Sequence, residues 1–140
     1  MSSRNKDQRK GREEILDRKK VQQWVKSGPT TTLIADAELF GKKLKQGGLT
    51  TSQIRQVFTK LKAIEAKGFH ETNKLEFLML KPYLAYAAGR HSSVKPLKTI
   101  IDYGIDSVVE DDKLDEQRKF KNFCKLFEAI LAYHRAHGGR

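Results

Sequence analysis

The chain has 140 residues, one cysteine, a formal net charge of +11 at pH 7 and a pI near 9.8. This length suits one domain with a single core, and the strong positive charge favours a polyanionic partner, most commonly a nucleic acid. The sequence shows no apolar run of the ~20 residues that a membrane span needs and no signal peptide, and Cys124 cannot form an internal disulfide, so we expect a cytoplasmic protein without membrane contact.

Residues 1–29 are predicted to form a basic N-terminal tail, and residues 30–140 a helical domain. The first dozen residues of the tail lack apolar side chains and should be disordered. Several apolar residues then follow, which could form an amphipathic turn or two that docks on the body. Among them, Trp24 is expected to be a packing anchor rather than a platform for base stacking.

Apolar side chains recur three or four residues apart in five further stretches, which predicts five helices. Thr50 with Gln53 fits a capping box at the start of the second helix, and Gly68 should close it. Pro82 should kink the third helix, and Gly89 should end it. No segment alternates strictly enough to be a strand, so the fold class is all-α: a compact bundle of about five helices with a basic, partly disordered N-terminal tail. The predicted helices cover residues 31–45, 50–67, 72–88, 93–109 and 115–137.

The third predicted helix requires a choice of core face. The residues that keep helical spacing, and so form its predicted apolar stripe, are Leu75, Leu78, Met79, Pro82, Tyr86 and Ala87. On the same ground, Tyr83 and Tyr86 are expected in the core rather than on a surface that stacks bases.

Two stretches of the chain, residues 39–64 and 77–101, contain no Asp or Glu although both carry several cations. A solvated helix normally mixes both signs, because opposite charges three or four residues apart stabilise it. Surfaces without acids are therefore typical of contact with a nucleic-acid backbone. The sign of the charge reverses in residues 102–116, which contain seven acidic residues and a single cation, Lys113. This acidic stretch could repel RNA from one face, dock a basic neighbour, or simply be a solvated helix end and loop.

Catalytic or metal-binding constellations are not evident. Cys124 lies beside apolar residues and is expected to be a small core residue. His134 and His137 have the spacing of a metal pair, but no third ligand type lies near them. The sequence thus predicts no enzyme, no cofactor and no metal. A helix-turn-helix formed by the second and third helices is disfavoured, because residues 66–71 exceed the usual tight turn.

Three stretches together resemble the small subunit of the type III-A (Csm) CRISPR effector complex. Residues 48–55 read Gly-Leu-Thr-Thr-Ser-Gln-Ile-Arg, and residues 80–90 read Leu-Lys-Pro-Tyr-Leu-Ala-Tyr-Ala-Ala-Gly-Arg. Residues 120–133 read Phe-Lys-Asn-Phe-Cys-Lys-Leu-Phe-Glu-Ala-Ile-Leu-Ala-Tyr. The resemblance covers about residues 30–136.

The resemblance implies a non-catalytic helical subunit that acts in antiviral defence. Several copies would stack as an inner filament and contact the guide RNA and the single-stranded target RNA, beside other Csm subunits that carry the catalytic activities. Whether the isolated chain forms a homodimer is left open. Arg55 and Arg90 match basic positions of the family and are the first choices for phosphate contact, because the guanidinium can pair bidentately with phosphate. Charge and helix face add the candidates Lys42, Lys43, Lys45 and Lys62, and the second acid-free stretch adds Lys81.

A free-standing helical DNA-binding regulator is the alternative. Such a protein reads base edges with Asn, Gln and Arg. The exposed face of the second predicted helix instead offers mainly Lys, Arg and Thr, which suit backbone contact.

Overall fold

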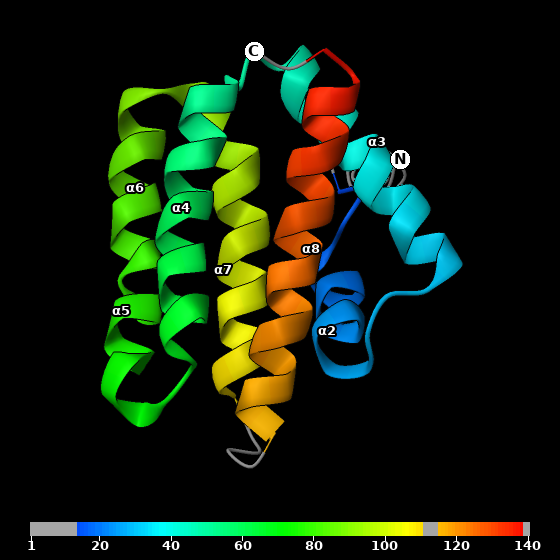
Figure 1. The fold of residues 1–140 in the computed structure, drawn as a ribbon. Helices are drawn as coiled ribbons and strands as arrows, with labels where there is room; N and C mark the ends of the chain where they lie inside the picture. The colour runs from blue at the N-terminus through cyan, green and yellow to red at the C-terminus, as the bar shows by residue number, and fades with distance from the viewer. Residues whose placement is uncertain (1–13, 111–114, 139–140) are drawn as a thin grey trace, which may run out of the picture.

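A computed structural model describes residues 14–110 and 115–138, in which all regular structure is helical (Figure 1). The all-α class is thus confirmed for the described part of the chain, while residues 1–13 of the predicted tail lie outside it. Short 3-10 turns at Glu71–Asn73 and Ser92–Val94 precede α5 and α7. The helices are α2 (Arg18–Ser27), α3 (Thr31–Gln46), α4 (Thr51–Lys67), α5 (Lys74–Leu78), α6 (Leu80–Arg90), α7 (Lys95–Val109) and α8 (Glu116–Ala136).

α8 is the central helix and packs against α2, α3, α4 and α7. α5 and α6 form one flank of the bundle and α3 the other (Figure 1). The core is rich in phenylalanine: the Phe77 ring meets Phe120 and Phe123 edge-on, with ring centroids 5.2 and 5.4 Å apart. Phe127 is fully buried and contacts the ring of Phe58. Aromatic contacts of this kind add to the stabilisation from burial itself.

α2 is the amphipathic segment of residues 1–29 that could dock on the body, and its apolar residues are buried in this core. Trp24 is only 2% exposed, and its indole N–H donates to the carbonyl of Asn122 at 3.0 Å. The Asn122 side chain in turn donates to the carbonyl of Val25 at 2.9 Å. The prediction that Trp24 is a packing anchor is confirmed, and the folded body extends to α2 and to the residues just before it.

The predicted boundaries of α3, α4 and α8 agree with the structure to within about a residue. The capping box forms, because the Thr50 hydroxyl accepts from the Gln53 N–H and the Gln53 side chain accepts from the Thr50 N–H. Gly48 and Gly68 adopt φ of 92° and 83°, which side-chain-bearing residues rarely adopt. These local signals end α3, start α4 and end α4.

The third predicted helix is divided, and its predicted end at Gly89 is wrong. α5 ends at Leu78 and α6 begins at Leu80, while Pro82 lies in the first turn of α6. The break fits the proline, because its ring would clash with the carbonyl of the residue four positions earlier, which is Leu78. α6 then continues through Gly89 to Arg90.

The predicted apolar stripe of α5 and α6 is partly wrong: Leu78 and Ala87 pack against the core, but three other residues of the stripe are exposed. Leu75, Met79 and Tyr86 are 69%, 55% and 67% exposed. The buried stripe is a neighbouring one at the same spacing, formed by Phe77, Leu80, Leu84 and Ala88. Tyr83 is half-buried. A helix with two apolar stripes satisfies the periodicity in either orientation, so spacing alone could not select the inner one.

A close crossing of α3 and α8 is built on Gly41. A Cβ atom at this position would lie 2.8 Å from Cβ of Tyr133 and 2.9 Å from the backbone nitrogen of His134. The crossing therefore requires glycine, and it fixes the C-terminal half of α3 against the last turns of α8.

Candidate nucleic-acid interface

Cations gather at one end of the bundle. α3, α6 and α8 end there, and α4 and α7 begin there, whereas α7 ends and α8 begins at the opposite end (Figure 1). A hydrogen bond of 2.7 Å between His134 Nε2 in α8 and the carbonyl of Leu49, just before α4, ties these helix ends together. Five of the seven predicted contact residues lie here. We call this group the basic end: Lys42, Lys43, Lys45, Arg55 and Arg90.

The basic end owes part of its charge to helix termini. Lys43 and Lys45 lie in the last turn of α3, and Arg90 lies in the last turn of α6. Cations are favourable at these positions because the unpaired carbonyls give a helix C-terminus a partial negative charge. Lys42, Lys45 and Arg55 are exposed, and none of the three pairs with a carboxylate of the described residues. Their charges are therefore available to an anionic partner.

The other two predicted contact residues lie elsewhere and carry carboxylate partners. Lys62 lies 2.6 Å from Glu65, and this hydrogen bond raises the pKa of Lys62. Lys81 forms an ion pair with Asp106 across α6 and α7. A phosphate would have to replace a carboxylate at either position, so we expect both lysines to contribute less than the basic end.

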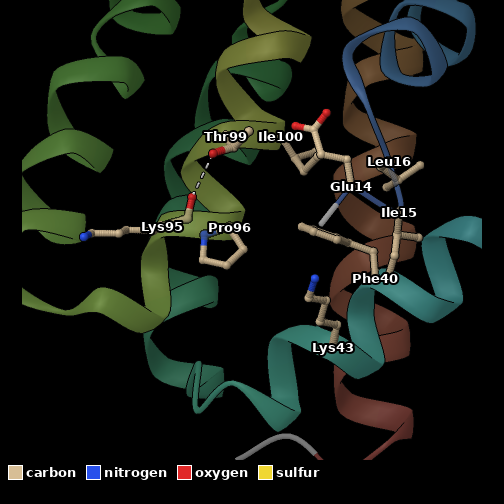
Figure 2. Close-up of a pocket in the computed structure, with 9 residues that line it drawn as sticks. All are labelled: Glu14, Ile15, Leu16, Phe40, Lys43, Lys95, Pro96, Thr99 and Ile100. Carbon is tan, nitrogen blue, oxygen red and sulfur yellow. Dashed lines mark hydrogen bonds between the residues drawn. The ribbon is translucent and has the colours of Figure 1, made fainter. Parts of the chain in front are cut away.

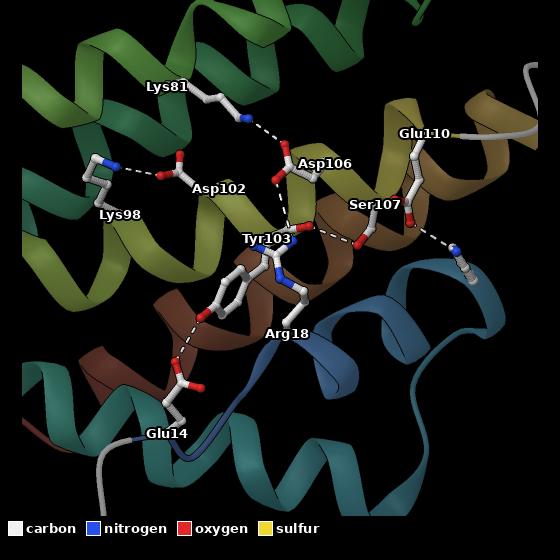
Figure 3. Close-up of polar contacts among 10 residues, drawn as sticks. Glu14, Arg18, Lys81, Lys98, Asp102, Tyr103, Asp106, Ser107 and Glu110 are labelled. Atoms are coloured by element: carbon white, nitrogen blue, oxygen red, sulfur yellow. Dashed lines mark hydrogen bonds and ion pairs between the residues drawn. The ribbon is translucent and has the colours of Figure 1, made fainter. Parts of the chain in front are cut away.

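The acidic stretch pairs largely with the chain's own cations (Figure 3). Asp106 contacts Arg18 at 3.6 Å in addition to Lys81. Glu110 contacts Lys26 at 3.0 Å. Three further pairs are Lys98–Asp102, Arg118–Asp115 and Lys74–Glu116. The described acids thus join α2, α5 and α6 to α7 and α8, a function that the sequence analysis did not consider.

One contact of this network reaches the N-terminal segment. The hydroxyl of Tyr103 donates to Glu14 at 2.8 Å, and the Arg18 guanidinium lies 4.6 Å from the centre of the Tyr103 ring (Figure 3). The bond to Glu14, together with burial, raises the pKa of Tyr103. The segment that leads into α2 is therefore held against α7.

A cleft of about 610 Å³ opens beside the basic end, between the N-terminal segment, α3 and the start of α7 (Figure 2). Its charged residues are Glu14, Lys43 and Lys95, and the hydroxyl of Thr99 donates to the carbonyl of Lys95 at 3.2 Å. The other lining residues are apolar. This lining contains no pair of a nucleophile and a base such as hydrolytic catalysis needs.

The cysteine and histidines that the sequence analysis considered for catalysis or metal binding contribute to the packing and hydrogen bonding of the fold. Cys124 is buried, and burial, with a smaller effect of Glu65, raises the pKa of its thiol to about 12. His134 is fully buried; because a carbonyl can only accept, its Nε2 must donate to Leu49. His137 contacts Glu38 at 3.2 Å. Within residues 14–110 and 115–138, no three side chains are arranged to hold a metal ion.

Two side chains on the surface of α4 and α6 beside the basic end were not predicted from the sequence as candidate contact residues. Tyr86 is exposed one turn before Arg90, and Lys60 lies 4.7 Å from the ring centre of Tyr83. The signal that could have found Tyr86 is the second apolar stripe of α6, which periodicity could not assign to the inside or the outside.

These features define an all-α protein with a basic end and with its described acids largely paired internally. Residues 28–140 match the protein family described as Csm2 Type III-A. The chain belongs to this family, which confirms the resemblance of its motifs to the Csm small subunit.

A curated protein of Enterococcus italicus, named CRISPR system Cms protein Csm2, is 34% identical over 95 residues. The match covers 61% of this chain and 66% of the relative, just under two thirds of its length. No solved structure matches the chain significantly. Among the described residues, no helix combines the length and the hydropathy that crossing a membrane requires.

Proposed function

We propose that this chain is a non-catalytic, RNA-binding small subunit of a cytoplasmic type III-A CRISPR ribonucleoprotein. It contacts the backbones of guide and target RNA through the basic end and assembles with the other Csm subunits. Family membership supports the complex, and the separation of charge along the bundle supports RNA as the ligand. The observation that carries the proposal is the gathering of Lys42, Lys45, Arg55 and Arg90 at one end, while the described acids of residues 102–116 pair with other cations of the chain.

Backbone contact fits these side chains better than base reading. Lysine and arginine neutralise phosphates and release condensed counterions, which makes affinity depend steeply on salt and little on sequence. A subunit that holds many different target transcripts needs this property.

The exposed apolar side chains support stacking of copies in a filament. Leu75 and Met79 lie on the α5–α6 flank, while Ile34 and Leu39 are 41% and 52% exposed on α3, the opposite flank (Figure 1). Exposed apolar side chains on two different surfaces suit a head-to-tail contact, which extends into an open filament when the rotation between copies does not close a ring. Met79→Glu should lower the number of copies in the assembled complex and leave the salt slope of RNA binding by the isolated chain unchanged.

RNA binding at several salt concentrations tests the proposal. The full chain, alone and in the assembled complex, is titrated against labelled single-stranded RNA and a guide–target duplex. Arg55→Gln and Arg90→Gln should each weaken binding and flatten the slope of log affinity against log salt by about 0.7–0.9 per copy. Arg118→Gln is the matched control, because Arg118 lies at the opposite end and contacts Asp115 and the carbonyl of Lys26.

Two results would count against the proposal. One such result is an equal salt slope for wild type, Arg55→Gln and Arg90→Gln together with a flatter slope for Arg118→Gln. RNA would then bind at the end that contains Arg118 and not at the basic end. Tight binding to one duplex DNA sequence, not displaced by RNA, would instead favour the free-standing regulator.

A further inference from the structure

Tyr86 is a largely exposed aromatic side chain, and the cation near its ring is the Arg90 guanidinium. Tyr86 is 67% exposed, although its position in a regular apolar stripe would suit burial. Its hydroxyl accepts from Arg90 Nη1 at 3.3 Å, and the Arg90 Cζ lies 5.9 Å from the ring centre. That separation is near the limit for a cation–π contact. The guanidinium therefore lies near the hydroxyl edge and leaves the ring accessible.

A second tyrosine of α6 extends this surface towards α4. The Tyr83 hydroxyl donates to the side-chain oxygen of Gln56 at 3.1 Å, and Lys60 Nζ lies 4.7 Å from the Tyr83 ring centre. These contacts hold Tyr83 in place one turn before Tyr86. Each tyrosine thus has a cation within reach of its ring, and Arg90 belongs to the basic end.

The combination of ring and cation favours RNA over a protein partner at Tyr86. Proteins that bind single strands combine a positive surface along the backbone with aromatic rings on which bases stack. A tyrosine has few rotatable bonds, so ordering it costs little conformational entropy. No carboxylate occurs in residues 77–101, so nothing on α6 itself repels a phosphate beside Tyr86.

We propose that Tyr86 stacks against an unpaired base of the bound RNA while Arg90 pairs with a neighbouring phosphate. The proposal rests on the proposed RNA-binding function and adds a base contact to the backbone contacts. The stacking contact of Tyr86 accepts any base, because every base has a π face. The ligand is single-stranded RNA, since bases in a duplex are already stacked on one another.

Two probes separate stacking from phosphate contact. The full chain is titrated against a labelled oligouridylate and against an abasic ribose–phosphate oligomer of equal length and charge. Tyr86→Leu should weaken oligouridylate binding about 5- to 150-fold, as expected for loss of one stacked base, and should leave abasic binding unchanged. Tyr86→Phe keeps the ring and should bind both probes like wild type. Arg90→Gln should weaken both probes and flatten both salt slopes.

The outcomes separate this inference from the proposed function. Wild type that binds neither probe overturns both. If wild type binds and Tyr86→Leu weakens both probes equally, or neither, the stacking inference is overturned while the backbone function stands. A lower copy number for Tyr86→Leu in the complex, with unchanged RNA affinity, also overturns it and assigns Tyr86 to contact between subunits. Arg118→Gln, at the opposite end of the bundle, is the control and should not change either affinity.

Discussion

Gly41→Ala tests the crossing that positions the lysines of α3. The added methyl group would meet Cβ of Tyr133 at 2.8 Å, the backbone nitrogen of His134 at 2.9 Å and the carbonyl of Ile130 at 3.1 Å. Two of these are backbone atoms of α8, so a rotamer change cannot relieve the contact. Overpacking of this kind lowers the free energy of unfolding by about 1–3 kcal/mol. The better helix propensity of alanine offsets about 1 kcal/mol of this loss. We therefore expect a net loss of up to about 2 kcal/mol.

Gly89→Ala is the matched control in the same fold. Gly89 lies inside α6, its φ is not positive, and a Cβ there would have no heavy atom within 4 Å. Only the propensity gain remains, so this variant should be more stable than wild type by about 0.5–1 kcal/mol. The two substitutions are chemically identical and should change stability in opposite directions.

Chemical denaturation followed by circular dichroism measures both variants. The midpoints should shift in opposite directions while the slopes stay equal, since neither change alters the surface exposed on unfolding. If Gly41→Ala stabilises the protein as much as Gly89→Ala, α3 and α8 do not approach as closely as the structure indicates. The positions of Lys42 and Lys43 relative to α8 would then have to be revised.

Three further predictions follow from other parts of the fold. Phe127→Ala should cost about 3–5 kcal/mol in a denaturant titration, because the ring is fully buried. Thr50→Ala should cost about 1 kcal/mol in the same titration, because it removes the cap of α4. The raised pKa of Tyr103 means that its bond to Glu14 stabilises the fold below the ordinary tyrosine pKa and is lost as pH rises through the folded value. Melting temperatures between about pH 8 and 11 should therefore fall less in Tyr103→Phe than in wild type.

Local signals predicted the fold well, and non-local contacts explain what they missed. The caps and glycines that bound α3 and α4 act within a few residues, so the sequence shows them directly. The ion pair between Lys81 and Asp106 joins residues 25 positions apart, and nothing in either local sequence reveals it. The charge count therefore predicted Lys81 as a phosphate contact. The inner face of α6 was missed for a related reason: the packing of α7 against α6, not the sequence of α6 itself, decides which stripe is buried.

The reactivity of the buried Cys124 thiol can report local unfolding of the bundle. The folded thiol is buried and, with a pKa of about 12, is almost wholly protonated near neutral pH, so it should react very slowly with a thiol reagent. Exposure would restore an ordinary pKa and with it a reactive thiolate. Because the chain has no other cysteine, the labelling rate under native conditions counts how often α8 separates from α4. Adding RNA to that assay would show whether a ligand at one end of the bundle slows the opening of its centre, without any substitution in the chain.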